Sequence, residues 1–146
     1  MNAINYMSVP VSIRFDDALL ERLRRRSRAV PGSTPSGLAQ LLIDEGLRMA
    51  EHPGVAFKDG PTGRRAAVAF GPDVWEIITY LKEIDERGEA AIAAAAQDLS
   101  LPSARIRLAL DYYSAFPDEI DQQVALADAA SRSAQAAWQA QQRLLA

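Results

Sequence analysis

The chain has 146 residues, of which 49% are hydrophobic and 24% are charged, and its formal net charge is −3. This composition is typical of a folded globular protein and argues against a fully disordered chain, and the length suits one ordinary domain or two very small ones. The chain has no cysteine and a single histidine, which excludes disulfides and cysteine metal sites and argues against zinc modules and Ser-His-Asp enzymes.

The first element that the sequence predicts is a strand over residues 9–15. Apolar side chains alternate there with other side chains, and this period of two favours a strand with one apolar face. The alternating apolar positions are Val9, Val11, Ile13 and Phe15. No second strand lies within hairpin reach, so we expect a second copy of the chain to supply the pairing strand.

Two helices are expected next. Asp16 or Asp17 can cap the first helix, which ends at Pro31-Gly32. Thr34 is a good N-cap for the second helix, with Pro35 at its first position. We expect this second helix to run to about residue 51.

His52-Pro53-Gly54 then breaks the chain and is the predicted domain boundary. The elements expected beyond it are a small hairpin from residues 55–57 and 66–70 and helices over 73–86, 89–98, 102–115 and 118–145. The sequence thus predicts three parts, namely residues 1–51, 52–117 and 118–146.

Residues 9–51 resemble the ribbon-helix-helix family of DNA-binding proteins. The matching residues are Val11-Ser12-Ile13-Arg14-Phe15, Asp16-Asp17, Leu19-Leu20-Glu21-Arg22-Leu23 and Gly32 followed by Thr34-Pro35-Ser36-Gly37-Leu38. The resemblance implies a homodimer in which two strands pair and enter the major groove of a double-stranded DNA operator. The expected fold is therefore mainly α: a ribbon-helix-helix dimer, then a small helix-turn-helix-like all-α domain and a long C-terminal helix.

The same resemblance implies roles for individual residues. The base-contacting residues would be Pro10, Ser12 and Arg14, of which Arg14 can donate two hydrogen bonds to guanine and Pro10 cannot donate any. Backbone N–H groups at the start of the second helix would hold a phosphate, around Thr34, Pro35 and Ser36. The dimer core would contain Val11, Ile13, Phe15, Leu38 and Leu42. The arginines at 22–28 are interpreted mainly as a solvated helix face.

Residues 52–121 look like the domain of unknown function 433 family, which is often found in antitoxins. The matching stretches are His52-Pro53-Gly54-Val55, Gly63-Arg64-Arg65-Ala66-Ala67-Val68, Val74-Trp75-Glu76-Ile77-Ile78, Ala109-Leu110-Asp111-Tyr112-Tyr113 and Pro117-Asp118-Glu119-Ile120-Asp121. The family's usual Gly-Thr-Arg before the first helix is replaced here by Phe70-Gly71-Pro72-Asp73. The resemblance implies an antitoxin that represses its own operon and restrains a PIN-like ribonuclease toxin.

The charge distribution and the final helix indicate which kinds of binding partner each half of the chain would suit. Residues 1–72 carry ten basic and seven acidic side chains, whereas residues 73–146 carry six and twelve. This balance favours an anionic partner for the first half and a basic protein surface for the second. A heptad-like stripe on the final helix includes the candidate partner contacts Val124, Trp138 and Leu145. The final helix could instead pack on its own domain or on the other protomer.

No enzyme is expected, because the sequence offers no nucleophile, metal-ligand set or phosphate-binding glycine loop, and His52 is interpreted as a turn residue. We expect no cofactor, no small-molecule substrate and no membrane partner. The chain shows no signal peptide and no transmembrane run, which favours a cytoplasmic location. Two alternatives stay open, a stand-alone transcriptional regulator and a protein-interaction module without DNA binding. In the stand-alone regulator, the acidic second half of the chain would serve only to form a dimer or a tetramer.

Overall fold

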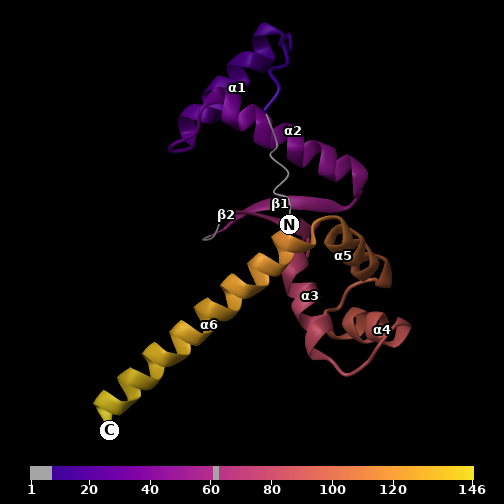
Figure 1. The fold of residues 1–146 in the computed structure, drawn as a ribbon, viewed down its shortest axis with the longest axis vertical. Coiled ribbons are helices and arrows are strands. Elements are labelled where there is room, and N and C mark those ends of the chain that lie inside the picture. The colour runs from indigo at the N-terminus through magenta and orange to yellow at the C-terminus, as the bar shows by residue number, and fades with distance from the viewer. Residues whose placement is uncertain (1–7, 61–62) are drawn as a thin grey trace. The chain divides into compact units, whose positions relative to one another are not determined.

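The computed structural model describes residues 8–60 and 63–146. The elements in these residues are α1 (Asp17–Ala29), α2 (Pro35–Glu51), β1 (Val55–Gly60), β2 (Gly63–Val68), α3 (Val74–Glu83), α4 (Glu89–Asp98), α5 (Ser103–Ala115) and α6 (Pro117–Leu145) (Figure 1). The chain divides into two compact units, Met1–Asp44 and Glu45–Ala146, which we name the N-terminal unit and the C-terminal unit.

The predicted strand over residues 9–15 is wrong. Residues 8–16 form neither strand nor helix, and the sheet in the described residues pairs β1 with β2, after two helices. Val9, Val11 and Ile13 are 77%, 77% and 56% exposed. A strand needs a neighbour for its backbone hydrogen bonds, and the described part of this chain offers none to this segment.

The predicted fold class is corrected accordingly. A ribbon-helix-helix arrangement of one N-terminal strand and two helices is wrong for this chain, because its strands lie after α2. The part beyond α2 is not all-α either, since β1 and β2 belong to the C-terminal unit. The coarser expectation of a mainly α protein is confirmed.

Side-chain caps set the starts of both helices in the N-terminal unit. The Asp16 carboxylate accepts a hydrogen bond from the Leu19 N–H at 2.8 Å, and the Thr34 hydroxyl accepts one from the Gly37 N–H at 3.1 Å. Both predicted caps are therefore confirmed. Gly32, at φ +74°, supplies the left-handed residue in the turn between the helices.

Salt bridges assign the last two turns of α2 to the C-terminal unit. Arg64 donates to both carboxylate oxygens of the buried Glu45, at 2.6 and 2.8 Å. Arg48 donates to the Tyr112 hydroxyl at 2.8 Å and to the Glu119 carboxylate at 3.0 Å. These contacts place the division between the units inside α2, before the predicted boundary at His52-Pro53-Gly54.

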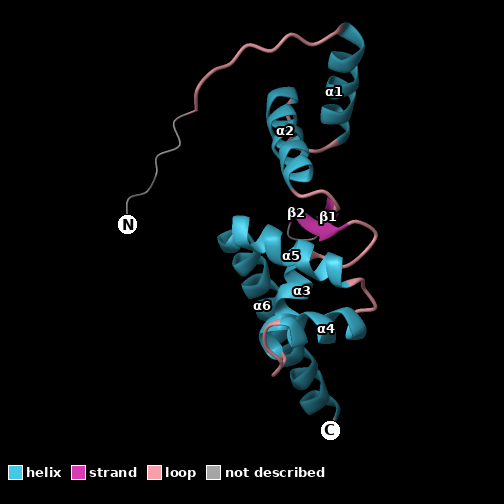
Figure 2. Ribbon diagram, turned by 90° about the vertical axis from the view of Figure 1, so that its right-hand side faces the viewer, coloured by secondary structure: helices cyan, strands magenta, loops and turns pink. Residues whose placement is uncertain are grey.

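The C-terminal unit has a closed apolar core. It lies between the β1–β2 hairpin, α3, α4, α5 and the first turns of α6 (Figure 2). The largest fully buried side chains are Val68, Val74, Ile77, Ile106, Tyr112 and Ile120. Burial of side chains of this size stabilises a fold by about 1.5–3 kcal/mol each, so this unit carries most of the packing of the chain.

The predicted hairpin is confirmed, with longer strands. β1 and β2 pair antiparallel from Val55 opposite Val68 to Gly60 opposite Gly63. Two residues of the predicted turn, Pro61 and Thr62, lie outside the described residues.

The C-terminal helices match their predicted positions closely. α4 has the predicted bounds of 89–98, and α5 and α6 each begin within one residue of their predicted starts. α3 ends at Glu83, three residues before its predicted end. No helix in the described ranges is long and apolar enough to cross a membrane.

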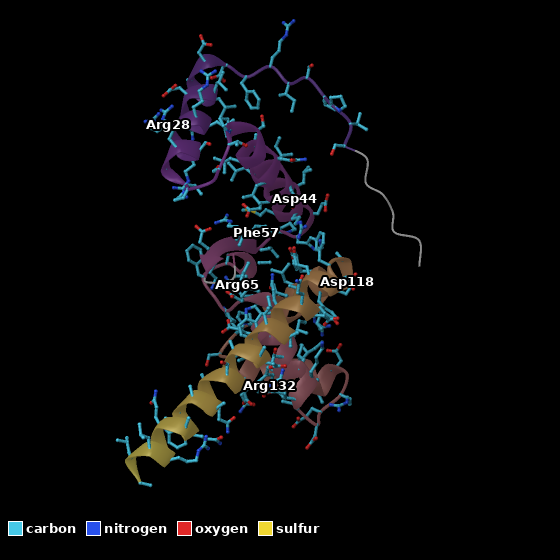
Figure 3. The ribbon with its side chains drawn as sticks, turned by 60° about the vertical axis from the view of Figure 1, so that its left-hand side comes forward. Arg28, Asp44, Phe57, Arg65, Asp118 and Arg132 are labelled. Atoms are coloured by element: carbon cyan, nitrogen blue, oxygen red, sulfur yellow. The ribbon has the colours of Figure 1, made fainter. Side chains whose placement is uncertain are left out.

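A buried carboxylate fixes the hairpin to the start of α3. The Asp73 side chain is 5% exposed and accepts from Arg65 Nε at 2.5 Å, Trp75 Nε1 at 3.0 Å and Lys58 Nζ at 2.9 Å. The Glu76 carboxylate accepts from the Asp73 N–H at 2.8 Å. In Figure 3, Phe57 marks β1 and Arg65 marks β2, the two paired strands. One side chain therefore connects β1, β2 and α3.

This carboxylate gives the C-terminal unit an acid-sensitive stability. Burial alone would raise the pKa of Asp73, but hydrogen bonds from Lys58, Arg65 and Trp75 lower it below its ordinary value of 3.8. A lowered folded-state pKa stabilises the fold above the unfolded pKa, and this stabilisation is lost as the pH falls through the folded value. In urea unfolding from neutral pH to below 3.8, we expect the stability difference between the wild type and Asp73→Asn to shrink as the pH falls. A difference that is constant with pH would contradict this account.

Candidate nucleic-acid interface

A ridge of three arginines runs along one side of α1. Arg22, Arg25 and Arg26 line one surface hollow together with Ala29. Their spacing of three and four residues puts them on the same helix face. At a rise of 1.5 Å per residue, the ridge is about 6 Å long. We name these three residues the arginine ridge.

The arginine ridge has no carboxylate partner within residues 8–44. The ion pair of α1 in these residues joins Arg28, which Figure 3 labels, to Glu21 at 3.2 Å. Glu21 stands four residues before Arg25 but is within ion-pair distance of Arg28 and of no ridge arginine. The N-terminal unit has six arginines and four acidic side chains. Half of these arginines therefore lie on one helix face, where none of them forms an ion pair with a side chain of residues 8–44.

Most basic side chains of the C-terminal unit, in contrast, are paired with carboxylates. Six of its basic side chains pair with carboxylates of the same unit. These pairs are Arg48–Glu119, Lys58–Asp73, Arg64–Glu45, Arg65–Asp73, Lys82–Asp121 and Arg107–Glu89. The C-terminal unit thus pairs six of its ten basic side chains with carboxylates, whereas the three arginines of the ridge form no ion pair within residues 8–44.

Like charges three or four residues apart destabilise a helix by a few tenths of a kcal/mol per pair. In the arginine ridge, Arg22 stands three residues from Arg25 and four from Arg26, and a bound polyanion would offset the repulsion between them. Guanidinium groups form bidentate hydrogen bonds with phosphate oxygens. One DNA strand presents a phosphate about every 3.4 Å along the helix axis, so the ridge can face about two phosphates.

The structure gathers several predicted site residues around a second hollow in the N-terminal unit. It brings together the N-terminal segment, α1 and the start of α2. The predicted residues among its lining are Pro10, Val11, Ser12, Ile13, Phe15, Pro35 and Ser36. The candidates for base contact, phosphate contact and dimer core are therefore close neighbours here.

Three other predicted residues lie elsewhere. Arg14 and Thr34 are exposed and do not line this hollow, and the Thr34 hydroxyl serves as the cap of α2. Leu38 is 8% exposed and belongs to the interior of the N-terminal unit. The base-contacting roles of Pro10, Ser12 and Arg14 depended on a strand that this chain does not form, and they stay predictions.

A small apolar hollow lies between α1 and α2. Its lining residues are Phe15, Leu19, Leu23, Ala39, Leu42 and Ile43. Leu19, Leu42 and Ile43 are 42%, 46% and 46% exposed. Within residues 8–44, Ser27 and Leu38 are the buried side chains. The apolar side chains of the two helices thus face each other without closing a core.

In the C-terminal unit, polar and aromatic side chains form a structural cluster around Arg48. The Arg48 guanidinium lies 3.9 Å from the centroid of the Phe116 ring, and the His52 ring packs edge-on against Tyr112. Burial raises the pKa of the Tyr112 hydroxyl, which donates to the Glu119 carboxylate at 3.0 Å. This cluster fastens α2 to α5 and α6, and the turn role predicted for His52 agrees with its place after α2.

The predicted partner contacts on α6 divide into two groups. Val124 is half-buried and packs against the core of the C-terminal unit. Trp138 and Leu145 are 60% and 78% exposed. In the described ranges, no three histidine or carboxylate side chains gather in a way that could hold a metal ion.

No family model, no curated protein and no solved structure matches the chain. The resemblances to the ribbon-helix-helix family and to the domain of unknown function 433 family therefore stay predictions.

The arginine ridge is not among the site residues that the sequence predicts. The sequence predicts mainly a solvated helix face for the arginines at 22–28, because they stand on the helix that the resemblance makes less suited to touch DNA. The useful signal is the spacing of Arg22, Arg25 and Arg26, which puts three guanidinium groups on one helix face, while Glu21, four residues before Arg25, pairs with Arg28.

Proposed function

We propose that the protein is a self-associating DNA-binding regulator that contacts double-stranded DNA through its N-terminal unit. The observation that carries this proposal is the arginine ridge, three guanidinium groups on one helix face that form no ion pair within residues 8–44. Phosphate neutralisation supplies most of the affinity of proteins for DNA. The ridge offers guanidinium groups at a spacing suited to consecutive phosphates of one strand.

Self-association is supported by the open interior of the same unit. Two buried side chains among residues 8–44 cannot offset the conformational entropy of ordering a helical hairpin, which costs about 1–2 kcal/mol per residue. A second copy that covers the apolar hollow between α1 and α2 would bury Leu19, Leu42 and Ile43. A two-fold dimer also presents two arginine ridges, as suits the two half-sites of a symmetric operator.

The antitoxin role stays a prediction that rests on the resemblance of residues 52–121. The regulator proposed here needs no toxin. A neighbouring gene for a PIN-like protein, followed by co-purification from the native locus, would test that further step.

The arginine ridge makes the proposal testable by direct binding. We expect Arg22→Gln/Arg25→Gln/Arg26→Gln to weaken the binding of the full chain to a fluorescent duplex by about tenfold or more, because each protomer loses about two phosphate contacts. Glutamine keeps a high helix propensity, so α1 stays intact. Fluorescence anisotropy measures the affinity, and circular dichroism verifies the helix content.

A matched control removes the same charge from the C-terminal unit. Arg87→Gln/Arg132→Gln/Arg143→Gln should bind the duplex as tightly as the wild type, because the proposal assigns these residues no phosphate. If the two triple variants lost equal affinity for the duplex, the loss would come from the change in net charge alone, and this would contradict the proposal. A wild-type chain that does not bind any duplex would favour the interaction module without DNA binding.

A further inference from the structure

The distal part of α6 is a helix without a partner. Residues 128–146 are all exposed, whereas the first turns of α6 pack on the core through Ile120 and Val124. This part of the helix extends away from α3, α4 and α5 (Figure 1). Most of the stability of a helix in a protein comes from packing of an apolar face, and the distal part has no such packing within the described C-terminal unit.

The face that packs at the base of α6 continues along the exposed part. Beyond Val124, spacings of three and four residues place six side chains on this face. They are Ala127, Ser131, Ala134, Trp138, Gln141 and Leu145. With Val124 at heptad position a, these residues occupy the alternating d and a positions of a coiled-coil seam.

The charges of the distal helix avoid this seam. Residues 128–146 contain three charged side chains, and Arg132 and Arg143 occupy positions b and f on the opposite face. Asp128 stands at position e, beside the base of the seam. An exposed helix face normally collects charge, so an uncharged seam that carries Trp138 and Leu145 has the composition of a contact surface.

The seam is complementary to itself when two copies run antiparallel. Two identical helices crossing at position 136 place Trp138 opposite Ala134 of the second copy. The next layers place Gln141 opposite Ser131 and Leu145 opposite Ala127. Each large side chain then meets a small one, and every layer joins an a position to a d position.

A parallel pair lacks this complementarity. It would place Trp138 against Trp138 and Ala127 against Ala127, which leaves a bulge beside a gap. We propose that distal α6 pairs antiparallel with the same segment of a second copy of this chain. This isologous contact goes beyond the proposed function and does not depend on DNA binding. Because it uses a different surface from the N-terminal unit, it would join dimers into tetramers that carry four arginine ridges.

The mass of the full-length chain in solution tests the pairing. We expect Trp138→Glu/Leu145→Glu to halve the mass of the assembly in sedimentation velocity at micromolar concentrations, because both added charges fall in the seam. The control Ala136→Glu/Gln139→Glu adds the same charge at positions f and b, and it should keep the wild-type mass. Glutamate is a good helix former in both variants.

Two outcomes would overturn the pairing. One is an assembly of the wild type with the same mass as that of Trp138→Glu/Leu145→Glu. Distal α6 would then not pair with a second copy and would be either unpaired or bound by another protein. The other is an equal loss of mass in the control, which would assign the effect to charge. Neither outcome affects the DNA affinity of the N-terminal unit. The pairing of α6 can therefore be disproved without disproving DNA binding, and the reverse also holds.

Engineered cysteines test the direction of the helices, because the chain has none of its own. Residues 127 and 145 are about 27 Å apart on one helix, so a disulfide between them must join two copies. We expect Ala127→Cys/Leu145→Cys to form covalent dimers under mild oxidation and Ala127→Cys alone to stay monomeric on non-reducing gels. Covalent dimers of the single variant would show a parallel pair and contradict the proposed register.

Discussion

Replacement of Asp73 by alanine is expected to lower the free energy of unfolding of the C-terminal unit by about 3 kcal/mol. Removal of one partner from a buried ion pair costs about 3–5 kcal/mol, because the remaining charge stays buried without compensation. Of the two cations, Arg65 contributes most of this cost, because its side chain is 20% exposed and its charge would stay mostly buried without a partner. Lys58 is 44% exposed and can turn to water, which argues for the lower end of the range. Urea unfolding, followed by circular dichroism, measures the change.

Asp59→Ala is the matched control for this prediction. Asp59 is a 77% exposed carboxylate on β1 that pairs with Arg64 at 3.3 Å. Arg64 keeps its two hydrogen bonds to Glu45 when Asp59 is removed, and exposed ion pairs contribute about 0–1 kcal/mol. Equal destabilisation by the two variants would show that the burial of Asp73 does not govern its contribution.

A charge in the apolar hollow of the N-terminal unit is expected to abolish the association of that unit. Ile43 lines both hollows of the unit and is 46% exposed. A glutamate there would be buried without a partner in the dimer, at a cost of several kcal/mol. In the Trp138→Glu/Leu145→Glu background, which leaves only this association, we expect Ile43→Glu to convert the dimer into a monomer in sedimentation velocity. We also expect some loss of helix content.

The control for this prediction is Leu41→Glu, made in the same background. Leu41 is 39% exposed on the same helix and lines neither hollow. It therefore makes the same chemical change outside the proposed interface, and the dimer should persist. Dissociation by both variants would place the interface elsewhere on α2, and dissociation by neither would contradict self-association through this unit.

Local signals predicted the helices of this chain well. The caps Asp16 and Thr34 and the bounds of α4 depend on residues within a few positions of each other, and the structure confirms them. The strand over residues 9–15 failed for the opposite reason. Alternation describes which face of a strand is apolar, but a strand forms only where another strand supplies hydrogen bonds, and the sequence does not show whether one is present.

The division of the chain and the candidate site were harder to predict. Arg64 and Glu45 are nineteen residues apart, and Arg48 reaches Glu119 across seventy-one. No local pattern shows that these contacts draw the last turns of α2 into the C-terminal unit. The three- and four-residue spacing of the arginine ridge can be read directly from the sequence. The sequence does not show that Glu21 pairs with Arg28 and that the ridge itself forms no ion pair within residues 8–44.

The salt dependence of DNA binding tests the central claim most directly. Each phosphate neutralised by the protein contributes about −0.9 to the slope of log affinity against log salt concentration. We expect the slope of Arg22→Gln/Arg25→Gln/Arg26→Gln to be shallower than that of the wild type by about 1.8 per protomer, the contribution of two phosphates. The Arg87→Gln/Arg132→Gln/Arg143→Gln control should keep the wild-type slope. Equal slopes for the ridge variant and the wild type would show that the arginine ridge contacts no phosphate and would contradict the account.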